Sequence, residues 1–285
     1  ERLLAGMGAD ELIDLVLRAL LEPGDAVLNC PPTFGMYPFS TAVNGGRTVA
    51  VPRDPDFALD VDGIIAAASA EPRAKVLFLC SPNNPDGGVI ADDALRRLLA
   101  LPLLVVLDEA YVDFAIAEGV PGRIEWAMDY DNLAVLRTFS KLAGLAGLRV
   151  GYGAFPEWLL PHLWKIKQPY NVNVAAALAA VAALAEREWL AERVGRLVAE
   201  RARIAREVAA LGWLWPFPSR ANFVLCRVDG MPAAALQRAL AAEGVLVRHF
   251  DKPGLRDCIR ISAGRPEDTD RLLAALRRVA PRSEG

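Results

Sequence analysis

The stretch LAVLRTFSKLAGLAGLR, residues 133–149, decides the fold class of this protein. Its first four side chains are apolar without alternation, which is typical of a strand covered on both faces of its sheet. The polar cluster RTFSK follows at residues 137–141, and Gly144 and Gly147 predict a loop. A buried strand that ends in polar residues is typical of an α/β protein, in which ligands bind beyond the carboxyl ends of the strands.

Short apolar strands alternate with amphipathic helices over the first half of the chain. Strands are predicted at residues 26–30, 48–51, 75–80, 103–108, 133–137 and 150–154, and helices at 10–21, 60–70 and 92–100. This alternation predicts an α/β fold with a mostly parallel sheet.

The pattern changes after residue 185. A long charged helix is predicted at 186–211, followed by a strand at 222–228, a helix at 232–243, a strand at 258–262 and a helix at 266–279. We therefore expect a large domain at 1–185 and a smaller α+β C-terminal domain at 186–285. The uncharged stretch 168–185 is too short to span a bilayer, and we expect a buried helix there.

Composition limits the function classes. The chain has 285 residues, of which 53% are apolar and 24% charged, and its net charge is -3. These values indicate a globular protein and give no electrostatic argument for a nucleic-acid or membrane partner. No signal peptide opens the sequence, and the four cysteines are far apart, so we expect core thiols in a cytoplasmic protein. With only two histidines and no Cys/His cluster, we expect no metal site.

Polar clusters follow three of the predicted strands. SPNNPDGG occupies residues 81–88, DEAY residues 108–111 and RTFSK residues 137–141. Each cluster alone could be a turn or a helix cap. Because the carboxyl ends of parallel strands lie at one edge of a sheet, the three clusters together predict one site.

These clusters resemble motifs of the fold-type I pyridoxal-phosphate enzymes. Within that group they resemble the histidinol-phosphate aminotransferases of the class I/II aminotransferase family. The resemblance covers nearly the whole chain. It extends to the motifs GADE (8–11), CPPTFGMY (30–37), AGLR (146–149), ANF (221–223) and CIRIS (258–262). It implies pyridoxal 5'-phosphate as cofactor, a small-molecule amino donor, a 2-oxo acid acceptor and a homodimer.

The resemblance assigns the reacting groups. Lys141, one of only five lysines, matches the Schiff-base lysine that also moves the proton at the substrate α-carbon. Asp108 matches the acid that keeps the ring nitrogen protonated, and an acid at the end of a buried strand is costly without a cationic partner. Tyr111 and Asn84 match the two hydrogen-bond donors to the phenolic oxygen of the cofactor.

The resemblance also assigns a phosphate cup. Ala9 and Asp10 stand at a predicted helix start, where backbone amides attract anions. The hydroxyls of Thr138 and Ser140 and the guanidinium of Arg149 complete the cup.

Three further residues match family positions outside the cup. Phe34 matches the aromatic ring that stacks on the cofactor, and Arg260 matches the arginine that grips the substrate α-carboxylate. Arg248 matches an arginine near the distal end of the substrate. A core phenylalanine and two surface arginines are the structural alternatives.

The sequence departs from the family at two places. Asp86 replaces the usual threonine of the SPNNP turn, a change that we expect to be neutral. The family also carries several dozen residues before GADE, including an arm that gives a tyrosine to the phosphate of the partner subunit. That arm is absent from this numbering, which begins at Glu1.

The leading hypothesis for function is transfer of an amino group between L-histidinol phosphate and 2-oxoglutarate in histidine biosynthesis. The alternatives are a threonine-phosphate decarboxylase of corrinoid biosynthesis, a broad aromatic amino-acid aminotransferase and, as a non-enzyme, an aminotransferase-like regulator domain. Fold analogy does not choose among them.

Overall fold

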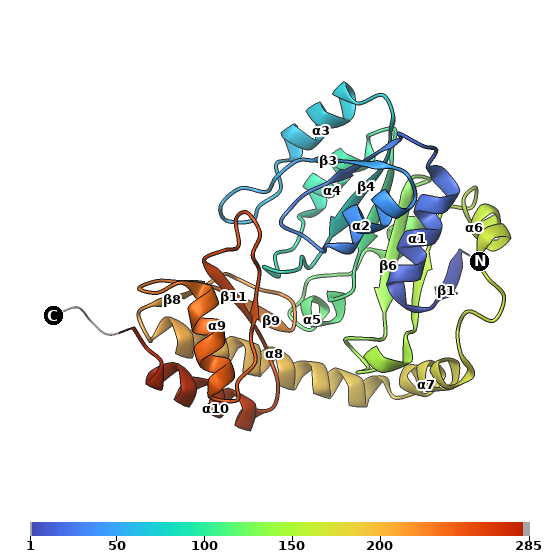
Figure 1. Cartoon of the computed structure of the whole chain (residues 1–285). Helices are drawn as coiled ribbons and strands as arrows, with labels where there is room; N and C mark the ends of the chain where they lie inside the picture. Colours follow the sequence, from blue (N-terminus) through green and yellow to red (C-terminus); the bar gives the residue numbers. More distant parts are fainter. Residues whose placement is uncertain (1, 282–285) are drawn as a thin grey trace.

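A seven-stranded sheet organises the first half of the chain (Figure 1). The structure is a computed structural model that describes residues 2–281. The strand order is β1-β7-β6-β5-β4-β2-β3; β2 to β6 run parallel, and β1 and β7 pair antiparallel. The strands are β1 (Leu3–Gly6), β2 (Ala26–Asn29), β3 (Arg47–Ala50), β4 (Ala74–Cys80), β5 (Leu104–Asp108), β6 (Leu133–Thr138) and β7 (Gly151–Ala154). The predicted α/β class with a mostly parallel sheet is confirmed.

Helices cover both faces of this sheet. The helices are α1 (Gly8–Leu20), α2 (Met36–Val43), α3 (Val61–Ala70), α4 (Asp92–Leu99), α5 (Val112–Ile116) and α6 (Leu160–Ile166), with short 3-10 turns η1 (Ile124–Met128) and η2 (Ala146–Leu148). One core contains side chains of α1, α2 and α6, and the other contains side chains of α3, α4 and η1. Neighbouring residues of one strand, such as Val27 and Leu28, belong to opposite cores. This two-sided burial explains why the strand sequences are apolar without alternation.

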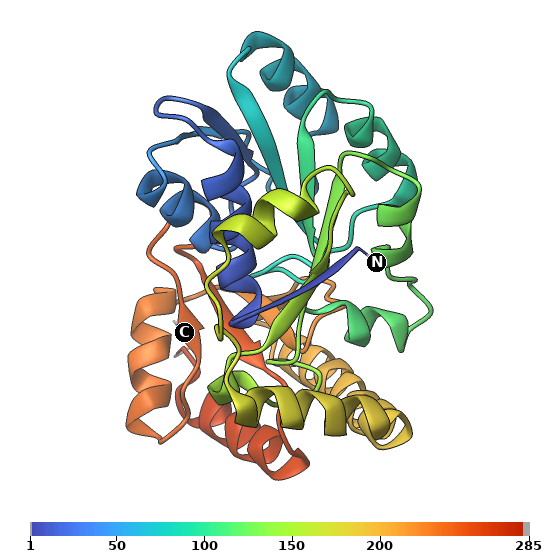
Figure 2. The same cartoon turned by 90° about the vertical axis from the view of Figure 1, so that its right-hand side faces the viewer.

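A second, antiparallel sheet forms in the last third of the chain, in the order β10-β11-β9-β8. Its strands are β8 (Leu214–Pro216), β9 (Phe223–Val228), β10 (Arg248–His249) and β11 (Cys258–Ser262). Three helices form its core with it: α8 (Arg187–Ala209), α9 (Ala233–Ala242) and α10 (Pro266–Arg278). Figure 1 shows α8 as a long rod below the large sheet that leads to the small one, and Figure 2 shows α1 and α2 (blue) on the other side of the large sheet from α4 (green).

The prediction of a buried helix at 168–185 is wrong. Helix α7 spans Val174–Ala185, and only Ala176 and Ala180 on it are buried. These two alanines pack on the chain that follows β6, next to Phe139. The larger side chains of α7 face solvent; Leu178, for example, is 67% exposed. An apolar stretch predicts burial, but in this helix only small alanine side chains contact the rest of the chain.

The structure also bears on the cysteines and on the prediction that no helix spans a membrane. All four cysteines are buried and free of disulfides, as expected for core thiols. In the part of the chain that the structure describes, no helix is long and apolar enough to cross a membrane.

Candidate active site

A cavity of about 120 Å³ lies at the carboxyl ends of β4, β5 and β6. The structure brings together here all ten residues predicted to bind the cofactor. They are Ala9, Asp10, Phe34, Asn84, Asp108, Tyr111, Thr138, Ser140, Lys141 and Arg149. Cys80, Ala110 and Ala146 also line the cavity. They carry no signal in the sequence, because such residues are common in cores and loops.

Asp108 is the last residue of β5 and is only 3% exposed. Its Oδ2 accepts a hydrogen bond from the Tyr37 hydroxyl at 2.7 Å, and its Oδ1 accepts one from the Ala110 amide at 3.0 Å. No cationic side chain among residues 2–281 forms an ion pair with it. Burial therefore raises the pKa of Asp108 to about 6, against the opposing effect of the Tyr37 hydrogen bond. A buried carboxylate without a counter-ion fits a cationic ligand group.

Lys141 lines the same cavity, in the turn after β6. Its Nζ is 5.5 Å from the ring centroid of Tyr111. Burial, and then the positive charge of Arg260, lowers the pKa of the Lys141 amine. The amine is therefore more readily neutral than a surface lysine, which is the form that attacks a carbonyl carbon.

The start of α1 also lines the cavity. Arg149 has a left-handed backbone, with φ of 54°, and its Nη2 lies 2.8 Å from Asp10 Oδ2. A Cβ added at Gly8, which has φ of 78°, would lie 2.7 Å from the same Nη2. Only glycine therefore lets the guanidinium lie against the first turn of α1. Backbone amides at a helix start, together with a guanidinium, suit a phosphate group.

Two hydroxyls complete this side. Thr138 at the end of β6 is 2.9 Å from Ser140 between their Oγ atoms, and the Ser140 amide donates to Thr138 Oγ1 at 3.1 Å. This local turn places both hydroxyls next to Arg149 in the cavity wall. The five predicted phosphate-binding residues are thus together.

Aromatic rings flank the cavity. Phe34 packs edge-to-face on Tyr37, with ring centroids 5.6 Å apart. Tyr111 packs edge-to-face on Phe223 of β9 at 5.1 Å. Burial raises the pKa of Tyr111, so its hydroxyl stays a hydrogen-bond donor at neutral pH.

A larger cavity of about 1070 Å³ adjoins the first, and Phe34 and Asn84 line both. Arg248 of β10 and Arg260 of β11 line only the larger cavity and are paired in register across the small sheet. Like charges placed opposite each other are destabilising unless an anion lies between them. The two predicted substrate residues therefore lie beside the cofactor residues and not among them. Lys252, which no sequence motif singles out, lines the same cavity on the exposed loop after β10.

The turn after β4 explains the unusual Asp86. Asp86 is 2% exposed and accepts hydrogen bonds from the Asn83 side chain and, at 2.7 Å, from the Gly88 amide. Asn83 in turn accepts from Thr33 Oγ1 at 2.7 Å. Asp86 and Asn83 thus stabilise the turn, while Asn84 faces the cavity.

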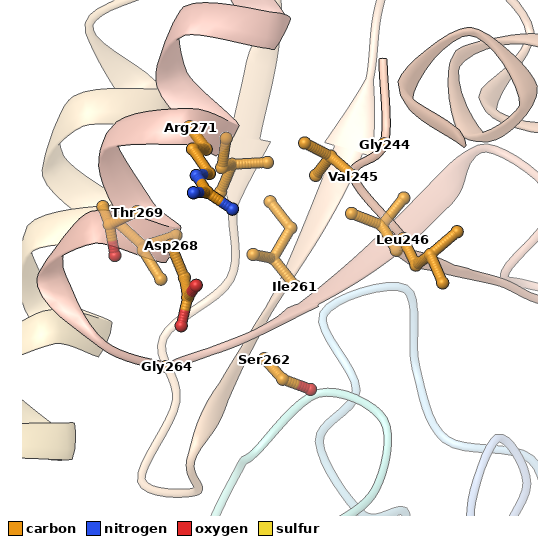
Figure 3. Close-up of a pocket in the computed structure, with 12 residues that line it drawn as sticks. Gly244, Val245, Leu246, Ile261, Ser262, Gly264, Asp268, Thr269 and Arg271 are labelled. Atoms are coloured by element: carbon orange, nitrogen blue, oxygen red, sulfur yellow. The ribbon is translucent and has the colours of Figure 1, made fainter. Parts of the chain in front are cut away.

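A third cavity, of about 230 Å³, lies between α8, β11 and α10 and is lined by none of the residues predicted to bind cofactor or substrate. Figure 3 shows Asp268 and Thr269 at the start of α10 on one side, Leu246 on the other and Ile261 between them. Asp268 is paired with Arg265, 3.2 Å away, which caps the helix. Among the described residues, no three His, Cys, Asp or Glu side chains are grouped as metal ligands would be.

The sequence profile of the family "Aminotransferase class I and II" matches residues 1–276. The chain therefore belongs to the class I and II aminotransferases.

Two curated relatives and one crystal structure narrow this class. Histidinol-phosphate aminotransferase 1, chloroplastic, of Arabidopsis thaliana is 51% identical to this chain over 278 residues, covering 97% of this chain and 66% of that protein. The histidinol-phosphate aminotransferase of Roseiflexus castenholzii is 51% identical over 283 residues, covering 98% and 75%. The crystal structure of histidinol-phosphate aminotransferase from Sinorhizobium meliloti in complex with pyridoxal-5'-phosphate has a TM-score of 0.88 and 33% identity, covering 98% of this chain and 77% of that one. The chain thus spans about two thirds of the length of the plant relative.

Proposed function

We propose that this chain is a pyridoxal-phosphate-dependent aminotransferase that transfers an amino group between L-histidinol phosphate and 2-oxoglutarate, with imidazole acetol phosphate and glutamate as products. One observation carries the proposal: a buried carboxylate without a counter-ion, a half-buried lysine and an arginine against a helix start line one cavity. The names of the relatives at 51% identity support the particular substrates.

The residues present fit pyridoxal phosphate. Asp108 would supply the negative charge that a protonated ring nitrogen needs, and Phe34 would lie against the ring. The start of α1, the hydroxyls of Thr138 and Ser140, and Arg149 would hold the phosphate. When bound, this cofactor withdraws electrons from the α-carbon of an amino substrate.

The chain's own groups account for the proton movements. Lys141 would bind the cofactor through its Nζ and then carry the proton that leaves the substrate α-carbon. The lowered pKa of its amine favours both roles. Tyr111 and Asn84 would donate hydrogen bonds to the phenolic oxygen of the cofactor and so stabilise its negative charge.

The larger cavity would bind the remainder of the substrate. Arg260 would take the α-carboxylate of glutamate, and Arg248 would hold the distal phosphate or carboxylate. Arg260 is half-buried, and its positive charge acts on both Tyr111 and Lys141 of the smaller cavity, which supports a contact near the reacting carbon. A buried guanidinium binds a carboxylate with two parallel hydrogen bonds.

We also propose a homodimer and a division into domains at residues 1–185 and 186–285. The dimer is supported by an apolar face on α7, formed by Val174, Leu178, Val181 and Leu184, which are 50–75% exposed. The opposite face of α7 packs on the turn that carries Lys141, so a second copy placed there would stabilise the site. The division is supported by the two separate sheets and by the end of α7 at Ala185.

The test compares four amino substrates with the cofactor-loaded full chain. Glutamate formation from L-histidinol phosphate and 2-oxoglutarate should exceed that from phenylalanine or tyrosine by at least an order of magnitude. Rapid release of CO₂ from O-phosphothreonine without glutamate formation would replace the proposed reaction with decarboxylation. Absence of turnover with all four, in a chain that binds the cofactor, would refute the proposed activity.

A further inference from the structure

Tyr37 is a fully buried tyrosine next to the cofactor cavity, on the first turn of α2. Its hydroxyl donates to Asp108 Oδ2 at 2.7 Å. A buried tyrosine is costly unless its hydroxyl has a partner, and Asp108 is that partner. The ring of Tyr37 is stacked on Phe78 of β4, with centroids 4.7 Å apart and planes 3° apart.

This contact fixes the direction of the Asp108 carboxylate. One carboxylate oxygen accepts from Tyr37 and the other from the Ala110 amide, so rotation of the carboxylate would break both hydrogen bonds. The Tyr37 ring is itself held between Phe78 and Phe34. The orientation of Asp108 therefore depends on a side chain that does not line the cavity.

We infer that Tyr37 is the positioning residue that keeps Asp108 ionised and aimed at the ring nitrogen of the cofactor. The inference rests on the proposed function, because that function supplies the ring. Tyr37 acts through two neighbours: its hydroxyl holds Asp108, and the edge-to-face contact of its ring holds Phe34. A single side chain thus aligns the carboxylate with the ring that would stack on the cofactor.

The titratable groups around Asp108 come from five parts of the chain. They are Tyr37 on α2, Cys80 on β4, Tyr111 after β5, Asp10 on α1 and Lys141 in the turn after β6. Burial raises the pKa of Asp108 to about 6, and the Tyr37 hydrogen bond is the largest influence in the opposite direction. Burial and the charge of Asp108 raise the pKa of Tyr37 far above its usual range, so Tyr37 stays a donor. Loss of its hydroxyl should therefore leave Asp108 more easily protonated.

The first experiment measures the protonation of Asp108 in the cofactor-free protein. The infrared band of a protonated carboxylic acid is followed against pH, and the band that disappears in Asp108→Asn identifies the residue. In the parent protein its midpoint should lie at about 6. Tyr37→Phe should raise that midpoint by about one pH unit, since a hydrogen bond to a charged group stabilises the charged form by that order. An unchanged midpoint in a folded Tyr37→Phe protein would overturn the inference.

A double-mutant cycle on cofactor affinity separates positioning from packing. Tyr37→Phe should weaken pyridoxal-phosphate binding several-fold in the parent and leave it unchanged in the Asp108→Asn background. Equal weakening in both backgrounds would mean that Tyr37 acts by packing alone, which contradicts the inference. Tyr130→Phe is the matched control, because its hydroxyl contacts Arg96 at the surface and no cavity residue.

A second variant covers the case in which Tyr37→Phe does not fold. Genetically encoded 3-fluorotyrosine at position 37 keeps the size of the side chain and makes the phenol a stronger donor. The Asp108 midpoint should then fall, and a midpoint that stays constant would refute the role of the hydroxyl. The infrared measurement needs neither cofactor nor substrate. A chain that shows the shifts but does not transaminate would disprove the proposed function alone, and an active chain without the shifts would disprove the Tyr37 inference alone.

Discussion

Arg260 Nη1 donates a hydrogen bond to Asn84 Oδ1, although 176 residues separate them in the chain. The contact joins β11 of the small sheet to the turn after β4 of the large sheet. Among the described residues, the buried Nε of Arg260 has no partner. The guanidinium is therefore only partly satisfied, which is the condition under which a substrate carboxylate gains most from binding it.

Arg260→Lys should slow the glutamate half-reaction far more than the histidinol-phosphate half-reaction. Lysine keeps the charge but cannot make two parallel hydrogen bonds to the α-carboxylate, and losing such a buried contact costs about 2–5 kcal/mol. Separate single-turnover measurements of the two half-reactions check this. Equal losses in both would show that Arg260 is structural.

Lys141→Ala should abolish covalent retention of the cofactor and lower turnover by at least ~10²-fold, the usual range for loss of a general acid–base group. After borohydride treatment and denaturing dialysis, the parent should keep pyridoxyl fluorescence and the variant should not. Lys75→Ala removes an exposed lysine on β4 and serves as the control. Retained fluorescence in Lys141→Ala would assign the covalent link to another lysine.

Asp108→Asn should stabilise the cofactor-free protein at pH 8 while weakening cofactor binding. The pKa of Asp108 is about 6 in the folded protein and 3.8 in the unfolded chain. A raised folded pKa contributes stability at low pH, and this contribution is lost as pH rises through about 6. Removing the charge should therefore raise the free energy of unfolding by on the order of 3 kcal/mol at pH 8, and by progressively less below pH 6.

Chemical denaturation of both proteins between pH 5 and pH 8 measures this effect. A stability difference that is flat with pH would mean that Asp108 does not titrate in this range. With saturating pyridoxal phosphate the parent protein should be more stable than Asp108→Asn, because the cofactor supplies the positive charge that Asp108 lacks.

Arg137→Met should destabilise the protein by about 3–5 kcal/mol, since it leaves the buried carboxylate of Glu109 unpaired. The two side chains meet at 2.7 Å, and the Glu109 side chain has 0% exposure. Arg18→Met breaks an exposed pair with Asp14 and should cost no more than about 1 kcal/mol. Denaturation midpoints of the two variants give the comparison, and similar losses would contradict it.

Leu178→Glu should convert the proposed dimer to monomers, because it places a charge in the centre of the exposed face of α7. Sedimentation velocity measures the mass of the particle. Leu246→Glu is the control, since Leu246 is 86% exposed on the small unit and away from α7. A parent chain that sediments as a monomer at micromolar concentration would refute the dimer.

The parallel strands and the site were predictable because both depend on local patterns. Residues 103–108 and 133–137 form uninterrupted apolar runs that end in polar clusters, and strands β5 and β6 follow them within a residue at each end. The motif matches then placed ten cofactor residues in one cavity. Their chemical roles stay predictions, as do the domain boundary at 185 and the dimer.

Tyr37 was not predicted as part of the site. It stands inside the quoted motif at 30–37, but its neighbours Met36 and Pro38 do not show that its hydroxyl faces Asp108, which is 71 residues away. The orientation depends on how α2 packs on β4, and this tertiary contact has no local signal. The exposure of α7 has no local signal either, because the pattern of apolar residues does not show which of them contact the chain that follows β6.

The pairing of β1 with β7 has a consequence for synthesis on the ribosome. Leu3 pairs with Ala154 and Gly6 with Gly151, and α1 packs against both β7 and α6. The first strand therefore has no partner until the residues of β7 have left the exit tunnel, whereas β2 and β4 can pair much earlier. Such non-local pairing slows folding and leaves apolar surface open to other molecules. Ribosome-bound nascent chains arrested before residue 150 should therefore bind chaperones, and chains arrested well beyond α6 should no longer bind them.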